Sequence, residues 1–290
     1  MELATVMAAP VCATLLADYG AEVIKIENPR APDVTRSWGR GDDPERTADP
    51  RLHTTVEGGG SSFVQLNRGK KSIGLNPTTT EGKEALMKLL ETADFFITNV
   101  RLKSLKKAGL DYESLADRFP KLIYGHLSAF GLDGPMVDDP GCEWGNGRWN
   151  GIVPDLPFAL CCCHCSSCCA DVTDDFGAFW AQSGLMDIVK SDDNSPPPRE
   201  PGGIGDYNTG MQLLGGVFAA LYDRTQTGKG QLVDASLMRA GVWSMAQPLV
   251  MNMGGNAYGT GVEWHDGSPA KNAPLRGSAV VGERVQFTTK

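Results

Sequence analysis

The sequence has no apolar run long enough to cross a bilayer, which argues against a membrane-spanning protein. Its first residues, Met-Glu-Leu-Ala-Thr-Val, lack the basic start and apolar core of a secretory signal peptide. The last residues carry no peroxisomal tripeptide. We therefore expect a soluble cytoplasmic protein with no membrane partner. A mitochondrial or peroxisomal address is the alternative if a terminal segment is missing.

Basic residues are also scarce, with 27 Lys and Arg against 35 Asp and Glu and a net charge of −8. This balance argues against a nucleic-acid partner. A Walker-type phosphate loop is absent, because no hydroxyl residue follows the lysine of Thr-Gly-Lys-Gly at residues 227–230. What remains is an ordinary globular composition, 41% hydrophobic over 290 residues, with room for one large or two modest domains.

Cysteine is rare outside one segment, because seven of the eight cysteines lie between Cys142 and Cys169. A zinc site could use Cys162, Cys165 and Cys168 with His164, but such crowded ligands match no standard zinc knuckle. A disulfide cluster does not suit a cytosolic protein. We interpret residues 142–170 as a retained intron that has been translated, and we expect no metal site.

The remaining pattern alternates between helices and strands. Apolar spacing predicts a helix at residues 12–19 and a strand at 22–27, then a strand–turn–strand passage at 63–75. An amphipathic helix at 80–90, a buried strand at 94–99, two short helices and a strand at 122–128 follow. This order is typical of an α/β fold with a doubly wound, mostly parallel, Rossmann-like sheet. We expect a large domain at residues 1–225. A linker, a strand and a helix from Leu237 to Met251 then begin a smaller second domain, incomplete at residues 226–290.

Asp206 occupies the most informative position, between a glycine run at residues 202–205 and an apolar helix at 211–222. Glycines let a backbone approach a ligand closely, and the first turn of a helix offers unpaired N–H groups and partial positive charge. Asp206 could therefore be an ionised nucleophile. The alternative is an ordinary helix N-cap.

The motif around Asp206 resembles the class III CoA-transferases. The resemblance includes Gly-Asp-Tyr-Asn-Thr-Gly-Met at residues 205–211, Tyr-Asp-Arg at 222–224 and Thr-Gly-Lys-Gly-Gln-Leu-Val-Asp-Ala-Ser-Leu at 227–237. The segment Leu-Leu-Ala-Asp-Tyr-Gly-Ala-Glu-Val-Ile-Lys-Ile-Glu at 15–27 is similar to the family's N-terminal region. The resemblance implies that Asp206 is the catalytic nucleophile and that the protein forms an interlocked homodimer. It covers almost all of this chain but only the front part of a family member.

The resemblance also implies a set of substrate contacts, carried over position by position. Expected contacts with coenzyme A come from Arg36, Leu75, Asn99, Val100, Arg101 and Lys107, and the active-site loop would comprise Met7, Ala8, Ala9 and Gly205. Some family members have glutamine at the Met7 position, and methionine cannot donate the same hydrogen bond.

Two of these expected contacts have simpler alternatives. Lys107 could belong to a solvated helix face together with Lys103 and Lys106. Arg36 could form a surface ion pair with Asp33. His126 lies on an apolar strand, where a structural role is expected rather than a catalytic one.

The implied reaction needs no cofactor, because the coenzyme A thioester is itself the substrate. The expected partners are an acyl-CoA and a small carboxylic acid, between which CoA moves through an aspartyl anhydride and an aspartyl–CoA thioester. Such intermediates hydrolyse easily, so water must be excluded, and the glycine-rich residues 254–261 could form a lid.

Two other functions remain open at the level of sequence. An α-methylacyl-CoA racemase has the same fold, but it carries a Gly-His-Asp segment where this chain has Gly141-Cys142. The chain could also be an inactive fragment from a faulty gene model, with apolar surface exposed.

Overall fold

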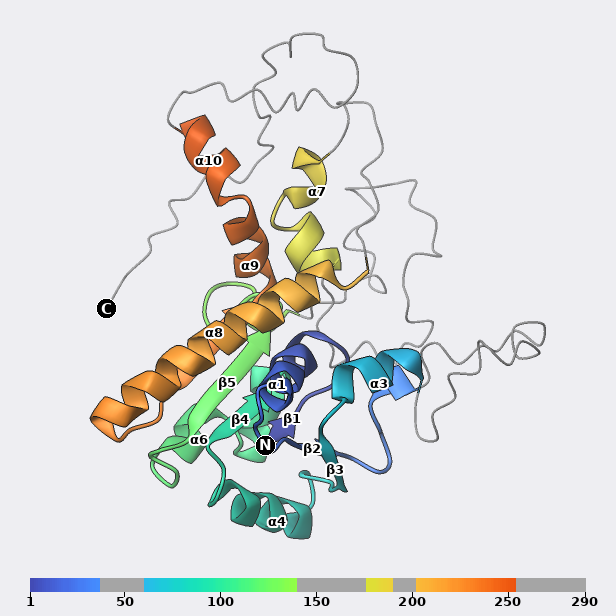
Figure 1. Ribbon diagram of the computed structural model, residues 1–290, viewed down its shortest axis with the longest axis vertical. Coiled ribbons are helices and arrows are strands. Elements are labelled where there is room, and N and C mark those ends of the chain that lie inside the picture. Colours follow the sequence, from blue (N-terminus) through green and yellow to red (C-terminus); the bar gives the residue numbers. More distant parts are fainter. Residues whose placement is uncertain (37–59, 140–175, 190–201, 254–290) are drawn as a thin grey trace, which may run out of the picture.

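The computed structural model describes residues 1–36, 60–139, 176–189 and 202–253, and its framework is a six-stranded parallel sheet (Figure 1). The strands follow the order β3-β2-β1-β4-β5-β6, and every neighbouring pair is parallel. Their bounds are β1 Glu2–Leu3, β2 Ile24–Glu27, β3 Lys71–Gly74, β4 Phe95–Thr98, β5 Ile123–Ser128 and β6 Leu232–Ser236. The predicted doubly wound α/β fold is confirmed.

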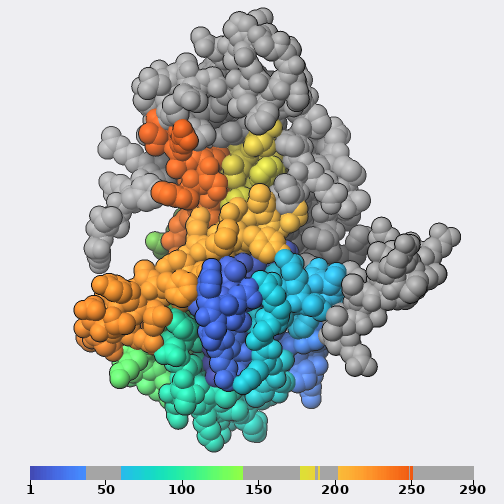
Figure 2. Space-filling model, viewed as in Figure 1, coloured from blue at the N-terminus to red at the C-terminus, as the bar shows by residue number. Residues whose placement is uncertain are grey.

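Helices cover both faces of this sheet. One face packs against α1 (Ala8–Asp18) and α8 (Ile204–Thr227), and the other against α4 (Thr80–Leu90), α5 (Leu102–Ala108) and α6 (Tyr112–Ala116). Side chains alternate across the sheet, so Ile97 of β4 joins the α1/α8 core while Phe96 joins the α4/α5 core. Figure 2 shows α8 lying across α1, with α3 beside α1.

Shorter elements complete the described chain. They are a 3-10 turn at Val34–Arg36, α3 at Ser61–Asn67, a π-helical turn at Phe176–Ala181, α7 at Leu185–Ile188, α9 at Leu237–Ser244 and α10 at Ala246–Met253. Met245 separates α9 from α10, so the single helix predicted from Leu237 to Met251 is in fact two.

The predicted strand at residues 63–66 is wrong, because these residues form the middle of α3. A run of only four residues with apolar ends fits both the helical repeat and the alternation of a strand, so its pattern of burial must decide between the two. Leu66 is buried, whereas Val64 is exposed and Phe63 lies beneath the Arg36 guanidinium. A second strand does follow, as β3.

Helix α4 spans the predicted residues, and its start follows from its sequence. The Thr79 hydroxyl accepts a hydrogen bond from the Gly82 amide at 3.1 Å and so caps the first turn. By contrast, α8 begins earlier than the helix predicted at residues 211–222. The additional residues at the beginning of α8 include Gly205. Glycine is needed there despite its low helix propensity, because a larger side chain would collide with the Phe179 ring.

Helix α8 runs back across the sheet, opposite to the strands. Near its C-terminal end, Arg224 donates to the carbonyl oxygens of Asp94 and Lys121, which lie at the amino ends of β4 and β5. The opposite end of α8 therefore lies at the carboxyl edge of the sheet, and Asp206 lies there with it.

The strand predicted to open a second domain is β6, and it pairs with β5 in the same sheet. Residues 254–290 lie outside the described part of the chain, so the division at residues 225 and 226 stays a prediction. No helix within the described ranges combines the length and the apolar character that a membrane span requires.

Two glycines of α8 should respond in opposite ways to replacement by alanine. A methyl group at Gly210 would lie 2.6 Å from the Ala8 carbonyl oxygen, whereas one at Gly215 would meet nothing within 4 Å. We expect Gly215→Ala to stabilise the protein by about 0.5–1 kcal/mol, because alanine favours the helix. Gly210→Ala should destabilise it by about 1–3 kcal/mol through overpacking. Urea unfolding of the two variants measures both effects, and equal changes would contradict this packing.

Candidate active site at the carboxyl edge of the sheet

The strand order creates a crevice between β1 and β4. From β1 the chain winds outward to β2 and β3, then crosses back and winds the other way through β4, β5 and β6. Ligands of such sheets bind where the winding reverses, outside the carboxyl ends of the strands. Met7 lies between β1 and α1, and residues 99–101 follow β4, so both segments border this reversal. The predicted active-site loop is partly helical, because Ala8 and Ala9 begin α1 and Gly205 lies in the first turn of α8.

Asn99 joins these two loops. Its side-chain amide donates to the Thr5 carbonyl at 2.8 Å, and its side-chain oxygen accepts from the Thr5 amide at 3.1 Å. Asn99 is buried, so this pair of hydrogen bonds is shielded from water. The structure thus gives Asn99 a bracing role within the protein, while its predicted contact with coenzyme A stays a prediction.

Val100 is held from the other side by His126. Nε2 of this buried histidine lies 3.0 Å from the Val100 carbonyl oxygen. A carbonyl can only accept, so Nε2 carries the proton in this contact. Nδ1 lies 3.6 Å from an Asp234 carboxylate oxygen on β6. His126 therefore has a structural contact, as expected for a histidine on an apolar strand, and that contact fixes the loop after β4.

Asp206 lies within the first turn of α8 and is 3% exposed. The N-cap is Gly203, whose φ of 79° suits glycine, so the alternative of Asp206 as the N-cap is wrong. Asp206 is the third residue of a 24-residue helix, close to the end where the helix dipole favours negative charge.

The surroundings of Asp206 are fixed by close approaches to glycine. Gly203 faces the end of the Met7 side chain and Gly210 faces the Ala8 carbonyl, so the segment between β1 and α1 lies against the beginning of α8. A methyl group at Gly205 would lie 2.5 Å from the Phe179 ring. Sequence reasoning did not select Phe179 as a site residue. The one feature of the sequence that could have pointed to Phe179 is that it is adjacent to a second aromatic residue, Trp180.

Arg36 lies at the carboxyl end of β2, where it forms two charged hydrogen bonds with Glu27. Nε and one terminal nitrogen lie 2.9 and 2.5 Å from the two carboxylate oxygens. The guanidinium carbon also lies 3.8 Å from the centre of the Phe63 ring. The alternative of a surface ion pair between Arg36 and Asp33 is wrong, because Arg36 pairs with Glu27 and the buried Asp33 pairs with Lys25. A contact between Arg36 and coenzyme A stays a prediction.

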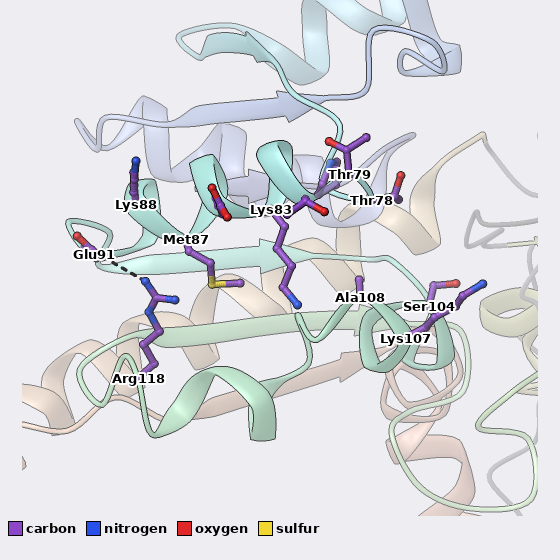
Figure 3. Close-up of a pocket in the computed structure, with 13 residues that line it drawn as sticks. Thr78, Thr79, Lys83, Met87, Lys88, Glu91, Ser104, Lys107, Ala108 and Arg118 are labelled. Atoms are coloured by element: carbon purple, nitrogen blue, oxygen red, sulfur yellow. Dashed lines mark hydrogen bonds and ion pairs between the residues drawn. The ribbon is translucent and has the colours of Figure 1, made fainter.

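Lys107 lines a pocket of about 880 Å³ between α4 and α5 (Figure 3). The pocket begins at residues 77–80, just beyond Leu75, and extends to Ser104 on α5. Its lining carries four cations and two carboxylates; the charged residues are Lys83, Glu84, Lys88, Glu91, Lys107 and Arg118. Arg118 pairs with Glu91, as the dashed line in Figure 3 shows. The net positive lining stands out in a chain of net charge −8 and suits an anionic ligand.

Several predictions lie outside the described residues. These include the cysteine-rich segment with His164 and the glycine-rich lid at residues 254–261. Across the part of the chain that is described, no three His, Cys, Asp or Glu side chains come together as a metal site. Cys12 is buried in α1, and burial raises the pKa of its thiol to about 12, which makes it unreactive.

The Glu27 carboxylate should make stability depend on pH. Burial would raise the pKa of Glu27, but hydrogen bonds from Arg36 and Ser72 and the Arg36 charge outweigh it and lower the pKa from 4.5 to about 2. A lowered pKa contributes stability above pH 4.5 that is lost as the pH falls towards 2. Glu27→Gln should therefore cost about 2 kcal/mol of unfolding free energy near neutral pH and progressively less in acid.

Urea unfolding at several pH values measures this difference. Glu22→Gln is the matched control, because the Glu22–Lys71 pair is exposed on both sides and should contribute little. A difference between wild type and Glu27→Gln that stays constant from pH 6 to pH 3 would contradict the assigned ion pair.

Comparison with known proteins gives a consistent picture. The chain is 32% identical over 256 residues to (R)-2-hydroxy-4-methylpentanoate CoA-transferase of Clostridioides difficile. The matched residues cover 88% of this chain and 53% of that protein. It is 32% identical over 245 residues to cinnamoyl-CoA:phenyllactate CoA-transferase of Clostridium sporogenes, covering 84% and 49%. The chain thus spans about half the length of the curated relatives it matches.

A solved structure shares the fold. It is a CAIB/BAIF family protein from Brucella suis, with a TM-score of 0.67 and 30% identity over 88% of this chain and 56% of that one. The profile of CoA-transferase family III matches residues 1–144 and 174–274. The unmatched residues 145–173 overlap the segment interpreted as a retained intron, although its origin stays a prediction. Because the profile covers most of the sequence, the chain belongs to CoA-transferase family III.

Proposed function

We propose that this protein transfers coenzyme A from an acyl-CoA to a carboxylic acid, with Asp206 as the covalent nucleophile. One observation carries the proposal: a buried carboxylate lies in the first turn of α8, at the carboxyl edge of a doubly wound sheet. The family membership and the names of the relatives support the same reaction.

The reaction begins when an Asp206 carboxylate oxygen attacks the thioester carbonyl carbon. The carbon–sulfur bond breaks, coenzyme A leaves as a thiolate, and a mixed anhydride joins Asp206 to the acyl group. The thiolate then attacks the Asp206 carbonyl carbon. The anhydride carbon–oxygen bond breaks, which releases the first carboxylate and leaves an aspartyl–CoA thioester.

The second half of the reaction reverses these steps with the acceptor acid. Its carboxylate attacks the aspartyl thioester, and the expelled thiolate attacks the acceptor carbonyl and frees Asp206. No net proton transfer is needed, so a racemase-type acid–base pair has no role here. The low exposure of Asp206 protects both intermediates from water. The first-turn N–H groups of α8 offset negative charge at the reacting carbonyl.

The acid substrate is proposed to be a 2-hydroxy acid. The two relatives described above are named for 2-hydroxy-4-methylpentanoate and phenyllactate, which share that group. The homodimer implied by the family resemblance stays a prediction of the sequence.

Replacing Asp206 by asparagine should abolish transfer, because an amide cannot form the anhydride. The purified 290-residue protein is incubated with cinnamoyl-CoA and phenyllactate, and transfer is followed by liquid chromatography. We expect a loss of about 10³-fold or more in Asp206→Asn. Asp223→Asn is the matched control, because Asp223 is exposed near the other end of the same helix.

Hydroxylamine should trap the intermediate as a hydroxamate on Asp206 in the wild type, and mass spectrometry can locate it. Transfer that persists undiminished in Asp206→Asn would overturn the proposal. Deuterium entering the α-carbon of a 2-methylacyl-CoA without an acceptor acid would favour a racemase instead.

The pocket predicts a difference between two neighbouring lysines. Lys107 lines it and Lys106 does not, although both are in the last turn of α5. If Lys107 contacts a CoA phosphate, Lys107→Ala should raise KM for acyl-CoA by about 5- to 20-fold with kcat unchanged. Lys106→Ala should change KM by less than about 2-fold. Equal effects in steady-state kinetics would mean that the two lysines act only through general charge.

A further inference from the structure

Four charged side chains are buried together between the first strands of the sheet. They are Glu2 on β1, Lys25 on β2, Asp33 before the 3-10 turn, and Lys70 before β3. All four side chains are at most 2% exposed. The cluster contains two positive and two negative charges, so its formal charge is zero.

Both ammonium groups in the cluster have a full set of acceptors. Lys25 Nζ lies 3.1 Å from Glu2 Oε1, 3.0 Å from Asp33 Oδ2 and 2.8 Å from the Ala4 carbonyl oxygen. Burial alone would lower the pKa of Lys25, but the two carboxylates outweigh it and raise the pKa. This ammonium group is therefore charged at neutral pH.

The second ammonium group reaches the beginning of α1. Lys70 Nζ lies 2.7 Å from Glu2 Oε2 and donates to the Pro10 carbonyl at 3.0 Å and to the Asn67 side-chain oxygen at 3.2 Å. The cluster thus bonds to the backbone before the active-site loop, at Ala4, and within the first turn of α1, at Pro10.

Asp33 makes a third backbone contact, with an unusual residue. Val6 has a φ of 65° and is the only non-glycine residue with positive φ in the described ranges. A β-branched side chain is strained in this region, at a cost of about 1–3 kcal/mol. The Val6 amide donates to Asp33 Oδ1 at 3.3 Å. Thr35 fixes the same oxygen through its amide at 3.0 Å and its hydroxyl at 2.8 Å.

The strained residue directly precedes Met7 and Ala8, which approach the beginning of α8. Gly203, Asp206 and Gly210 are spaced three and four residues apart, so they share one face of the helix. Met7 approaches Gly203 and the Ala8 carbonyl approaches Gly210, on either side of Asp206 along that face. A different backbone conformation at Val6 would therefore move the wall beside the nucleophile.

Stability alone does not account for such a cluster. Buried ion pairs contribute little net stability, because desolvation offsets their attraction. Backbone strain that persists beside a reactive carboxylate requires surroundings that hold it.

We propose that Asp33 is a positioning residue for the transfer reaction: it holds Val6 in its left-handed conformation and so fixes the Met7–Ala8 backbone beside Asp206. This role rests on the proposed function, because it acts through the nucleophile. Lys25, Glu2 and Lys70 anchor Asp33 and the two ends of the loop.

A double-mutant cycle between Asp33 and Val6 tests this role. Asp33→Asn removes the charge that anchors the side chain to Lys25, and we expect kcat to fall about 10- to 100-fold while KM for acyl-CoA changes little. Val6→Gly alone should change kcat by less than about 5-fold, because glycine adopts positive φ without strain. In the double variant, kcat should recover at least about 5-fold relative to Asp33→Asn.

The recovery distinguishes positioning from general support of the fold, which glycine at position 6 would not restore. If Asp33→Asn does not fold by circular dichroism, Thr35→Val replaces it, since all four charges are kept. We then expect a loss of about 3-fold in kcat, again relieved by Val6→Gly. Multiplicative, uncoupled losses in an active enzyme would overturn this role alone. A wild type without transfer activity would overturn the proposed function and this role together.

Discussion

The close approach of α8 to the loop after β1 is the constraint on which the site depends. Gly210 allows it, because a methyl group there would lie 2.6 Å from the Ala8 carbonyl oxygen, and Gly203 makes room for the end of the Met7 side chain. Gly205 makes room in the same way for the Phe179 ring. Glycine lowers helix propensity, yet at position 210 it lets the α8 backbone approach the Ala8 carbonyl, four residues after the buried Asp206. The glycines therefore lower the local stability of α8 where it approaches the loop after β1. Packing of the other residues of this 24-residue helix against the core offsets that loss.

The buried charges make sense beside this constraint. The loop after β1 has a strained residue at Val6, and no apolar contact could direct the Val6 amide as Asp33 does. A charged acceptor binds that amide strongly, but it must itself be neutralised once it is removed from water. Lys25 provides this neutralisation. The same ammonium group also donates a hydrogen bond to the Ala4 carbonyl, so it connects Asp33 to the backbone of the loop after β1.

The sequence predicts the sheet and the position of Asp206 well, because both leave local signals. Short apolar runs mark the strands at 94–99 and 122–128, and apolar residues at helical spacing mark α4. The prediction of a strand at 63–66 was wrong because a short apolar run does not distinguish a helical repeat from strand alternation. The charged cluster could not be predicted, since its members lie up to 68 positions apart, from Glu2 to Lys70, and look like surface residues. Only the fold brings them together.

The two parts of the site lie on opposite faces of the sheet. Asp206 belongs to α8, which packs on the same face as α1, whereas the cationic pocket lies between α4 and α5 on the other. A ligand that uses both must cross the carboxyl edge, and the reversal between β1 and β4 is where the sheet permits this. The Thr5–Asn99 hydrogen bonds lie at that crossing. They fix the distance between the loop after β1 and the loop after β4, so any ligand that reached from Asp206 to the cationic pocket would pass over a rigid edge.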